Sequence, residues 1–290
     1  MIRLASCTIS LLALCALALP AWSQPATPAP PAAPADESLF SDWTFTVTPY
    51  LWLFNLKGDV GVRGQQTSVD TNLFDLFEDN DSVLGVEANF QARNGPWTLL
   101  VDPTWLRIED DFHLSGDLGV RLSGDVTATT WIIDLMVMRE VWRMDIGAPV
   151  VEEGMPKRGL ALDLLGGTRI WVLSMDADFD ITTPGPIFDD LSSDLDRTET
   201  WADPVLGARG TWDITDRIHL LLRGDIGGFE VASDLTSEQW ASLVYDFGVF
   251  GRDVFATVGY RGLYTDYDNN GGFLMDTWLH GPTIGVGMKF

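Results

Sequence analysis

The residues in this sequence best suited to chemistry are charged side chains that recur inside short apolar segments. Six carboxylates and four arginines alternate there with aliphatic and aromatic residues. Buried charges persist only when they are paired or hydrated. The set therefore predicts either a structural ion-pair network or a polar conduit in which arginine and aspartate select small solutes. The ten residues are Glu87, Asp102, Asp134, Asp163, Arg169, Asp203, Arg209, Arg223, Asp225 and Arg261.

A second candidate is a short acidic segment that matches the start of a calcium-binding loop. Its oxygen ligands would alternate along the chain, and Gly271 would supply the turn, as in the D-x-D-x-N-G pattern. The match is incomplete because Thr277 stands where a bidentate glutamate is needed. The segment is therefore either a calcium site or an ordinary Asx-rich hairpin turn. The candidate ligands are Asp266, Asp268, Asn270 and Asp276.

Three histidines are the candidates for acid–base catalysis. His113 lies beside two aspartates in an acidic connection, His219 lies near a short turn, and His280 lies in the last apolar segment. No nucleophile motif accompanies His113. The sequence also has no glycine-rich phosphate loop, zinc pattern or dinucleotide-binding fingerprint. We therefore expect no catalytic residue and no enzymatic activity, with a lipid-modifying enzyme as the least favoured alternative.

The elements that must position these residues are β-strands, because apolar residues recur at every second position from Trp43 onward. The last segment places Ile284, Val286, Met288 and Phe290 on one face. This arrangement resembles the C-terminal signal by which bacterial outer-membrane barrels are recognised for insertion. A lipid-facing stripe through the final residue favours a membrane barrel over a soluble sandwich, since a closed barrel satisfies every backbone polar group in lipid.

Short turns and long acidic connections alternate along the chain, which predicts an up-and-down antiparallel barrel of about ten strands, with eight or twelve as alternatives. Residues 58–80 are open to three interpretations: an extension of the first strand, a hairpin, or a short helix at 73–77. The ten expected strands are 43–56, 82–93, 97–108, 122–143, 159–175, 200–213, 217–229, 236–247, 253–265 and 273–290.

The N-terminal region predicts export. Residues 1–23 combine Arg3, an apolar run and a small-residue site that ends at Ser23, which is typical of a cleaved signal peptide. Residues 24–42 begin with a stretch rich in proline and alanine and are expected to form a periplasmic linker before a barrel at 43–290. No later apolar run is long enough for a membrane-spanning helix. We therefore expect the protein in the cell outer membrane.

Charge composition narrows the partners. The chain has 42 acidic residues against 18 Lys and Arg, a net charge of −24, and yet 46% hydrophobic residues. Nucleic acid is excluded because phosphate binding needs clustered cations. Most of the excess acid falls in external connections, where anionic lipopolysaccharide would repel it unless Ca²⁺ or Mg²⁺ bridged the two. These connections are 70–81, 109–117, 176–199, 230–238 and 266–276.

Several segments resemble a family of exported Gram-negative outer-membrane β-barrel proteins of unassigned function. The resemblance covers nearly all of the mature chain and implies the fold, and it supplies no activity or substrate. Glu230 and Val231 depart from the pattern, as does the longer segment 181–199. The segments that carry it are Thr48–Trp52, Lys57–Val60, Trp201–Arg209, Gly224–Phe229, Ser233–Thr236, Gly259–Arg261 and Gly281–Pro282.

These observations together predict a monomeric outer-membrane barrel. Its expected partners are outer-membrane lipid, lipopolysaccharide and the barrel-assembly machinery. Two roles remain open. The first is a porin-like small pore or membrane-integrity protein. The second is a non-conducting structural or adhesion barrel whose acidic connections engage cations, lipopolysaccharide or an external partner.

Overall fold

A computed structural model describes residues 42–62, 65–71, 82–115, 121–146, 158–182, 191–249, 251–269 and 271–290 of the chain. The expected signal peptide and nearly all of the linker lie outside these residues. The segment Asp42–Phe290 forms one compact unit. It consists of strands, in agreement with the alternating pattern. No helix in the described residues is long and apolar enough to cross a bilayer.

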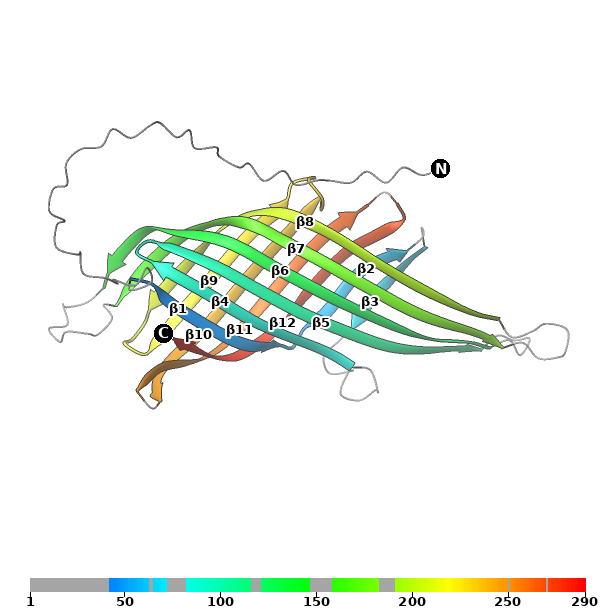
Figure 1. Ribbon diagram of the computed structural model, residues 1–290, viewed down its shortest axis with the longest axis horizontal. Coiled ribbons are helices and arrows are strands. Elements are labelled where there is room, and N and C mark those ends of the chain that lie inside the picture. The colour runs from blue at the N-terminus through cyan, green and yellow to red at the C-terminus, as the bar shows by residue number, and fades with distance from the viewer. Residues whose placement is uncertain are drawn as a thin grey trace, which may run out of the picture. The chain divides into compact units, whose positions relative to one another are not determined.

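Twelve strands form a single antiparallel sheet that closes on itself (Figure 1). Each strand from β4 to β12 pairs with the next along the chain, and β1 pairs with both β4 and β12. The wall is therefore a barrel of ten strands, β1 and β4–β12, as predicted. The strands are β1 (Thr44–Trp52), β2 (Asn55–Val62), β3 (Gln65–Thr71), β4 (Ser82–Asn94), β5 (Trp97–Ser115), β6 (Arg121–Asp145), β7 (Gly159–Thr182), β8 (Leu191–Asp213), β9 (Ile218–Gly228), β10 (Leu235–Val249), β11 (Arg252–Asp268) and β12 (Phe273–Lys289).

The two remaining strands form a hairpin. β2 pairs with the first half of β12 and β3 pairs with β2, so β2 continues the path of β1 along the same neighbour. The break between β1 and β2 lies at Leu53, whose amide donates to the Pro282 carbonyl at 3.0 Å. Proline has no amide hydrogen to continue the ladder. Of the three interpretations of 58–80, the hairpin is therefore confirmed for β2 and β3, and the helix expected at 73–77 lies outside the described residues.

Three strands are much longer than the sequence pattern indicated. β5 continues to Ser115, β7 to Thr182, and β8 begins at Leu191, each at least seven residues beyond its expected limit. Alternation marks a strand only where one face is apolar and the other is not. Toward the loop end, beyond the apolar part of the wall, neither face of a strand needs to be apolar. The strand pairing therefore continues there without an alternating pattern. Much of what was expected to be external loop is therefore strand.

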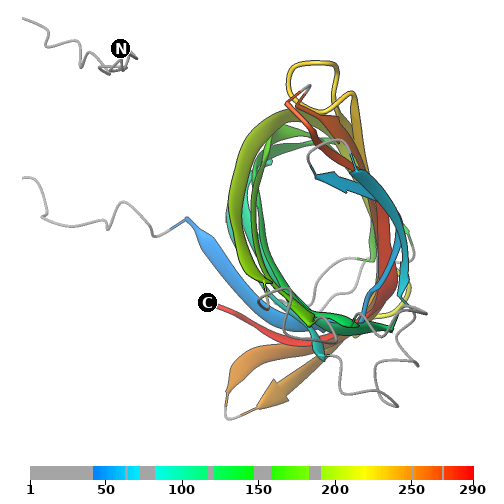
Figure 2. The same cartoon turned by 90° about the vertical axis from the view of Figure 1, so that its right-hand side faces the viewer.

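The two ends of the barrel differ. One end has tight connections around Gly95, residues 214–217 and Gly251, and we call it the turn end. The opposite end, the loop end, carries the β2–β3 hairpin and the longest strands (Figure 1). Seen end-on, the strands form a closed ring of elliptical outline (Figure 2).

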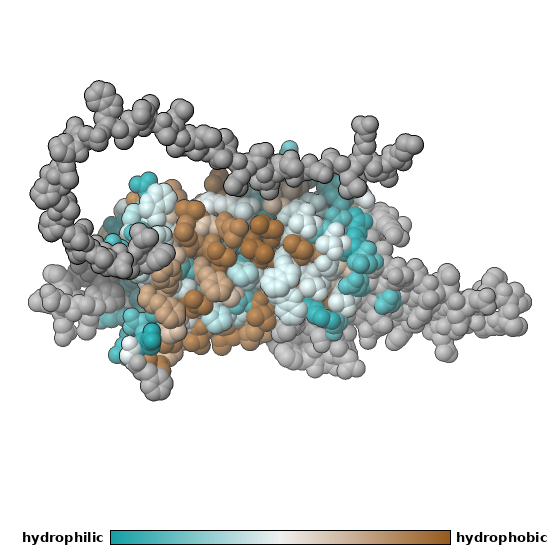
Figure 3. Space-filling view, in the orientation of Figure 1, coloured by the Kyte–Doolittle hydropathy of each residue, from teal (hydrophilic) through white to brown (hydrophobic). Residues whose placement is uncertain are grey.

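The wall has an apolar outer face. Leu164, Leu206, Ile226, Val258 and Ile284, from five strands, are each more than half exposed, which is unusual for residues of this type. Figure 3 shows such residues gathered in a band across the visible face, with hydrophilic residues to either side. Near the turn end, Trp97, Trp142 and Trp212 are also exposed. We refer to these outward residues as the apolar band.

Candidate functional site: the barrel interior

The interior has three layers along the barrel axis. The loop-end half holds a cluster of buried aromatic and aliphatic side chains, the aromatic plug. Below it lies a layer of buried carboxylates and guanidinium groups, the ion-pair layer. Next to the turn end is a cavity of about 730 Å³, the turn-end cavity. The plug consists of Trp52, Phe54, Leu56, Leu106, Ile132, Trp171, Leu173, Trp201, Leu263, Tyr267, Phe273, Met275 and Leu279.

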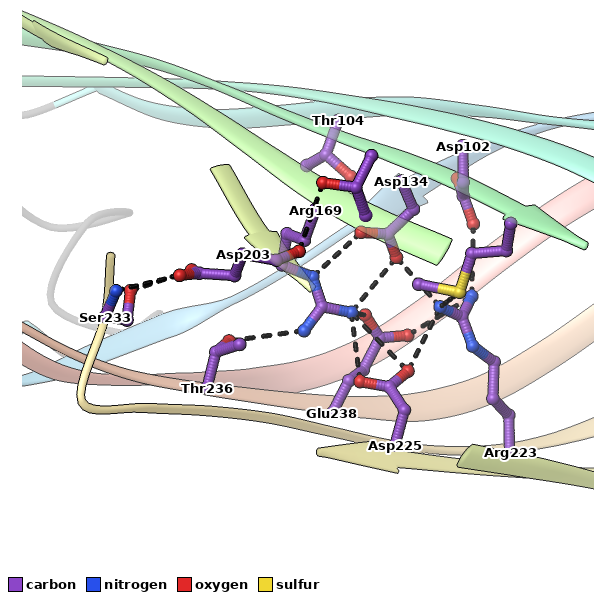
Figure 4. A network of polar contacts seen from close by, with 12 residues as sticks. Asp102, Thr104, Asp134, Arg169, Asp203, Arg223, Asp225, Ser233, Thr236 and Glu238 are labelled. Atoms are coloured by element: carbon purple, nitrogen blue, oxygen red, sulfur yellow. Dashed lines mark hydrogen bonds and ion pairs between the residues drawn. The ribbon is translucent and has the colours of Figure 1, made fainter. Parts of the chain in front are cut away.

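The ion-pair layer draws on seven strands and is centred on Arg169 of β7 (Figure 4). Its Nε donates to Oδ1 of Asp134 at 2.8 Å, and its Nη2 donates to Oδ2 of the same residue at 3.1 Å. Nη2 also reaches Glu238 at 2.8 Å and Asp225 at 3.2 Å. These four side chains are fully shielded from solvent. Arg169 therefore ties β7 to its neighbour β6 and, across the interior, to β9 and β10.

Arg223 and Arg261 complete the cationic part of the layer. Nη2 of Arg223 donates to Asp134 at 2.8 Å and to Asp225 at 3.1 Å. Arg261 donates through Nη1 to Glu87, and through Nη2 to Glu238 at 2.9 Å. Because Glu238 accepts from both Arg169 and Arg261, the groups form one continuous network. Such fork-shaped donors can hold several carboxylates at fixed geometry.

The remaining carboxylate of the layer is held by neutral donors. Tyr50 Oη and Asn89 Nδ2 each donate to Asp102 at 2.9 Å. Arg223 Nη1 lies 3.9 Å from the same carboxylate. The layer as a whole thus has five carboxylates, on Glu87, Asp102, Asp134, Asp225 and Glu238, against three guanidinium groups. Removing an arginine would leave carboxylates without a counter-charge in a site that water does not reach.

The plug packs directly on this layer. The guanidinium of Arg261 lies 4.7 Å from the centre of the Trp52 ring, within cation–π distance. Above it the rings of Trp171 and Trp201 stack at 5.4 Å, and Tyr267 stacks on Trp201 at 4.1 Å, both nearly parallel. The stack runs from Trp171 on β7 through Trp201 on β8 to Tyr267 on β11. The side chains of both layers are buried inside the barrel.

All ten charged residues named from the sequence lie in the interior. Seven belong to the ion-pair layer. Arg209 and Asp163 form a separate pair at 2.9 Å that borders the turn-end cavity. The carboxylate of Asp203 instead accepts from the backbone amide of Ser233 at 2.8 Å and from its hydroxyl at 2.7 Å. It thereby fixes the β9–β10 connection, where Phe229 and Glu230 adopt positive φ.

One essential residue was placed wrongly from the sequence. Glu238 was counted among the external acids of 230–238, whereas the structure buries it completely at the centre of the ion-pair layer. The available signal was the register of its own strand. Leu243 and Tyr245 point outward from β10, which puts the even-numbered positions on the inner face. Glu238 lies near the expected start of this strand, where the sequence pattern assigns acidic residues to the connection, so its inward position is missed.

The candidate calcium residues lie at the β11–β12 connection. Asp266 stands opposite Asp276 in the strand pairing, and Asp276 accepts a hydrogen bond from Tyr264 at 2.8 Å. Asn269 Oδ1 accepts from the amides of Gly271 and Phe273, which is the geometry of an Asx turn. Asn270 lies outside the described residues. Within the described part of the chain no group of three or more acidic, histidine or cysteine side chains is arranged for a metal ion, and the calcium site stays a prediction.

The histidines are separated from one another. The His219 ring lies between Asp213, 2.8 Å from Nδ1, and Asp246, 2.9 Å from Nε2, at the turn end. His280 lies on the outer face, where its Nδ1 is 2.7 Å from the Tyr260 hydroxyl. The side chain of His113 is outside the described residues. Neither described histidine has a serine, threonine or cysteine hydrogen-bonded to its ring in the structure.

The expected insertion signal lies on the outer face of β12. Ile284, Val286 and Phe290 are each more than half exposed, and Met288 is partly exposed. The backbone amide and carbonyl of Phe290 both bond to Phe45 at the start of the wall, so the last residue takes part in barrel closure. Inward glycines on this strand make room for large neighbours. A Cβ at Gly287 would lie 2.2 Å from the ring of Phe255.

Comparisons with known proteins identify no family. No family model and no curated protein matches the chain. Among solved structures, the outer-membrane protease OmpT from Escherichia coli shares 11% identity at a TM-score of 0.42, over 88% of this chain and 99% of that one. The translocator domain of the autotransporter NalP from Neisseria meningitidis shares 12% at 0.39, over 85% and 88%. Likenesses at this level assign no activity.

Proposed function

We propose that this protein is an integral outer-membrane β-barrel that does not conduct solutes, because its own side chains close it. The observation that carries the proposal is the two-layer filling of the interior by the ion-pair layer and the aromatic plug. The structural or adhesion role weighed from the sequence is thereby favoured over the porin-like role. A pore would require both layers to move.

The membrane location is supported by the apolar band. Its residues point away from the interior on consecutive strands, while the charged residues of the same strands point inward. A water-soluble protein of this size seldom exposes so large an apolar surface. A closed barrel also leaves no unpaired wall strand within the band, as lipid requires. The signal-peptide pattern and the outward Phe290 favour the outer membrane, with the turn end toward the periplasm.

Closure is supported by the burial of the layers. Trp171, Arg169, Arg261 and Ile132 are each 0% exposed, although they point toward the axis of a barrel. Ten strands enclose a space that side chains can largely fill. Each charged group in the layer is bonded to at least one other, so no group is free to move aside without breaking ion pairs. Passive diffusion through this interior is therefore blocked.

A solute-flux measurement tests the proposal. Proteoliposomes that contain the purified protein should swell in a small sugar no faster than empty liposomes. A matched variant, Trp52→Ala with Arg261→Ala, removes one contacting pair that spans both layers, and it should admit the sugar if it retains its β-sheet circular dichroism. Swelling of wild-type liposomes at the rate of the opened variant would overturn the proposal.

The acidic loop end supports a proposed role in contacts outside the cell. Asp59, Asp276 and Asp266 stand side by side across β2, β12 and β11. Adjacent like charges repel one another unless a counter-ion lies between them. We propose that divalent cations and lipopolysaccharide neutralise this row. A chelator should then lower the melting temperature of the protein in lipopolysaccharide-containing membranes, and an unchanged melting temperature would count against it.

A further inference from the structure

The turn-end cavity exists because inward side chains are small on that side of the ion-pair layer. Thr46 and Thr48 of β1, Ala161 of β7, Ser242 of β10 and Thr257 of β11 line it, where the plug at the other end has tryptophan, phenylalanine and leucine. The resulting volume, about 730 Å³, lies within the range of small-molecule binding sites. The side-chain sizes along the barrel therefore leave one end closed and the other hollow.

The cavity opens at the turn end. At its inner end, the side chain of Arg223 is 2% exposed. Toward the turns, the side chains of Lys289, Arg143 and Arg93 are 41%, 40% and 38% exposed. The basic side chains are thus far more exposed at the mouth than at the floor. A molecule could enter from the turn end, while the ion-pair layer would stop it from passing through.

The cavity lining has more basic residues relative to acidic ones than the chain as a whole. The whole chain has 42 acidic residues against 18 Lys and Arg. The cavity lining instead has five basic residues, Arg93, Arg143, Arg209, Arg223 and Lys289, against four aspartates, Asp145, Asp163, Asp213 and Asp246.

His219 also lines the cavity, where its two ring nitrogens lie 2.8 Å from Asp213 and 2.9 Å from Asp246.

The cations at the mouth have capacity to bind a further anion. Arg93 and Arg143 both pair with the carboxylate of Glu140. Lys289 lies 3.3 Å from both oxygens of Asp246, longer than is usual for a charge-assisted hydrogen bond. These three groups surround the entrance. Their side chains are more exposed than those of Glu140 and Asp246, at 16% and 27%, so they are the more accessible groups for an incoming carboxylate.

The wall between mouth and floor is largely apolar. Leu100, Met138, Leu221, Val244 and Phe255 contribute to it from five strands. Neutral polar groups, such as Gln91 and Ser242, are interspersed. A lining of this kind favours a ligand with an apolar body and one polar end.

We propose that the turn-end cavity binds a small amphipathic carboxylic acid, with its apolar body between Leu100, Met138 and Phe255 and its carboxylate at the mouth beside Lys289. Its single negative charge would face the exposed cationic groups of Lys289, Arg143 and Arg93. An amine would meet the cations at the mouth, and an alcohol would gain no ion pair. Binding from the turn end is compatible with a barrel that conducts nothing.

Fluorine NMR tests this proposal with 4-(4-fluorophenyl)butanoate, a water-soluble acid of suitable size, added to the full-length mature protein in lipid nanodiscs. The acid should bind saturably. The matching alcohol and amine should bind at least tenfold more weakly. Lys289→Glu should weaken binding of the acid by a similar factor, whereas Lys57→Glu, at the loop end, should leave it unchanged.

Two cavity-filling variants locate the site. Ser242→Phe and Thr257→Phe each place a ring in the cavity and should abolish saturable binding, and the second serves if the first does not fold. The proposal fails if wild-type binding does not saturate, if a folded filled variant binds as well as wild type, or if the amine binds as tightly as the acid.

Discussion

At the scale of single residues, the interior shows how charge can be buried in a barrel. Each arginine of the ion-pair layer contacts more than one carboxylate, and each carboxylate accepts from at least one arginine or neutral donor. Isolated buried ion pairs often contribute little net stability, but removing one partner is costly. Substituting one partner of such a contact can therefore lower stability much more than substituting the other. The difference between the two losses shows the role of each residue.

Substitutions at Arg261 and Glu87 should differ in this way. Arg261→Met leaves Glu87 buried without its arginine partner, removes one of the two arginines that donate to Glu238, and should lower the free energy of unfolding by about 3 to 5 kcal/mol. Glu87→Gln keeps the shape and the hydrogen bonds and reduces the excess negative charge of the layer, so its effect should stay below about 1 kcal/mol. Urea unfolding in a lipid bilayer measures both. Equal losses for the two variants would contradict the account.

Asp266 should make the protein less stable as pH rises. This residue lies beyond the aromatic residues Tyr264 and Trp278, outside the apolar band. Burial and the carboxylates of Asp276, Asp234 and Asp268 raise the pKa of Asp266 above its usual value. A raised carboxyl pKa means that the folded state binds the proton more tightly, so stability falls as pH increases through that pKa. Asp266→Asn should raise the melting temperature at neutral pH and flatten its pH dependence.

Asp216 provides a control for that measurement, because its pKa is shifted in the opposite direction to that of Asp266. A hydrogen bond from Arg158 lowers the pKa of Asp216, so this group stabilises the fold above its unfolded-state pKa and loses that effect as pH falls through the lowered value. Asp216→Asn should lower the melting temperature slightly at neutral pH. The interpretation of Asp266 fails if both variants shift the melting temperature in the same direction.

At the scale of elements, the ten wall strands could be predicted because one face had to be apolar. β9 and β12 were located to within one or two residues, since Leu222 and Ile226, or Ile284 and Val286, alternate with polar or small residues. The upper parts of β5, β7 and β8 could not be predicted, because the pattern disappears where both faces are polar. The inward positions of the ten charged residues followed from the same alternation. The central position of Glu238 and the order of the three interior layers could not be predicted in this way, since they depend on contacts between strands distant in the sequence.

Because β8 is proposed to span the membrane, the loss of unfolding free energy caused by an introduced charge should depend on its position along the strand. Leu206 lies within the apolar band on β8 and is 60% exposed. Leu206→Arg should reduce the free energy of unfolding in a bilayer by about 2 to 4 kcal/mol, because the charge would face hydrocarbon. Thr198→Arg on the same strand, toward the loop end, should have an effect under about 1 kcal/mol. Equal effects of the two variants would contradict a membrane-spanning β8.

At the scale of the whole molecule, the strong acidity and the high apolar content are separated in space. Apolar residues form the outer band, charged residues are paired inside, and in the described part of the chain Asp59, Asp276 and Asp266 form an acidic row at the loop end. The same axis organises the interior, from the aromatic plug through the ion-pair layer to the turn-end cavity. Under the proposed function, a chain that is both acidic and rich in apolar residues would span the membrane and stay closed, with the loop end toward external contacts and the turn-end cavity open to a ligand.

Single-channel recording in planar bilayers tests closure most directly. The account predicts that purified wild-type protein, shown to be inserted, gives no discrete conductance steps at moderate voltage. The variant with Trp52→Ala and Arg261→Ala should give them. Stable, reproducible steps from the wild-type protein would contradict the central claim that the two interior layers close the barrel.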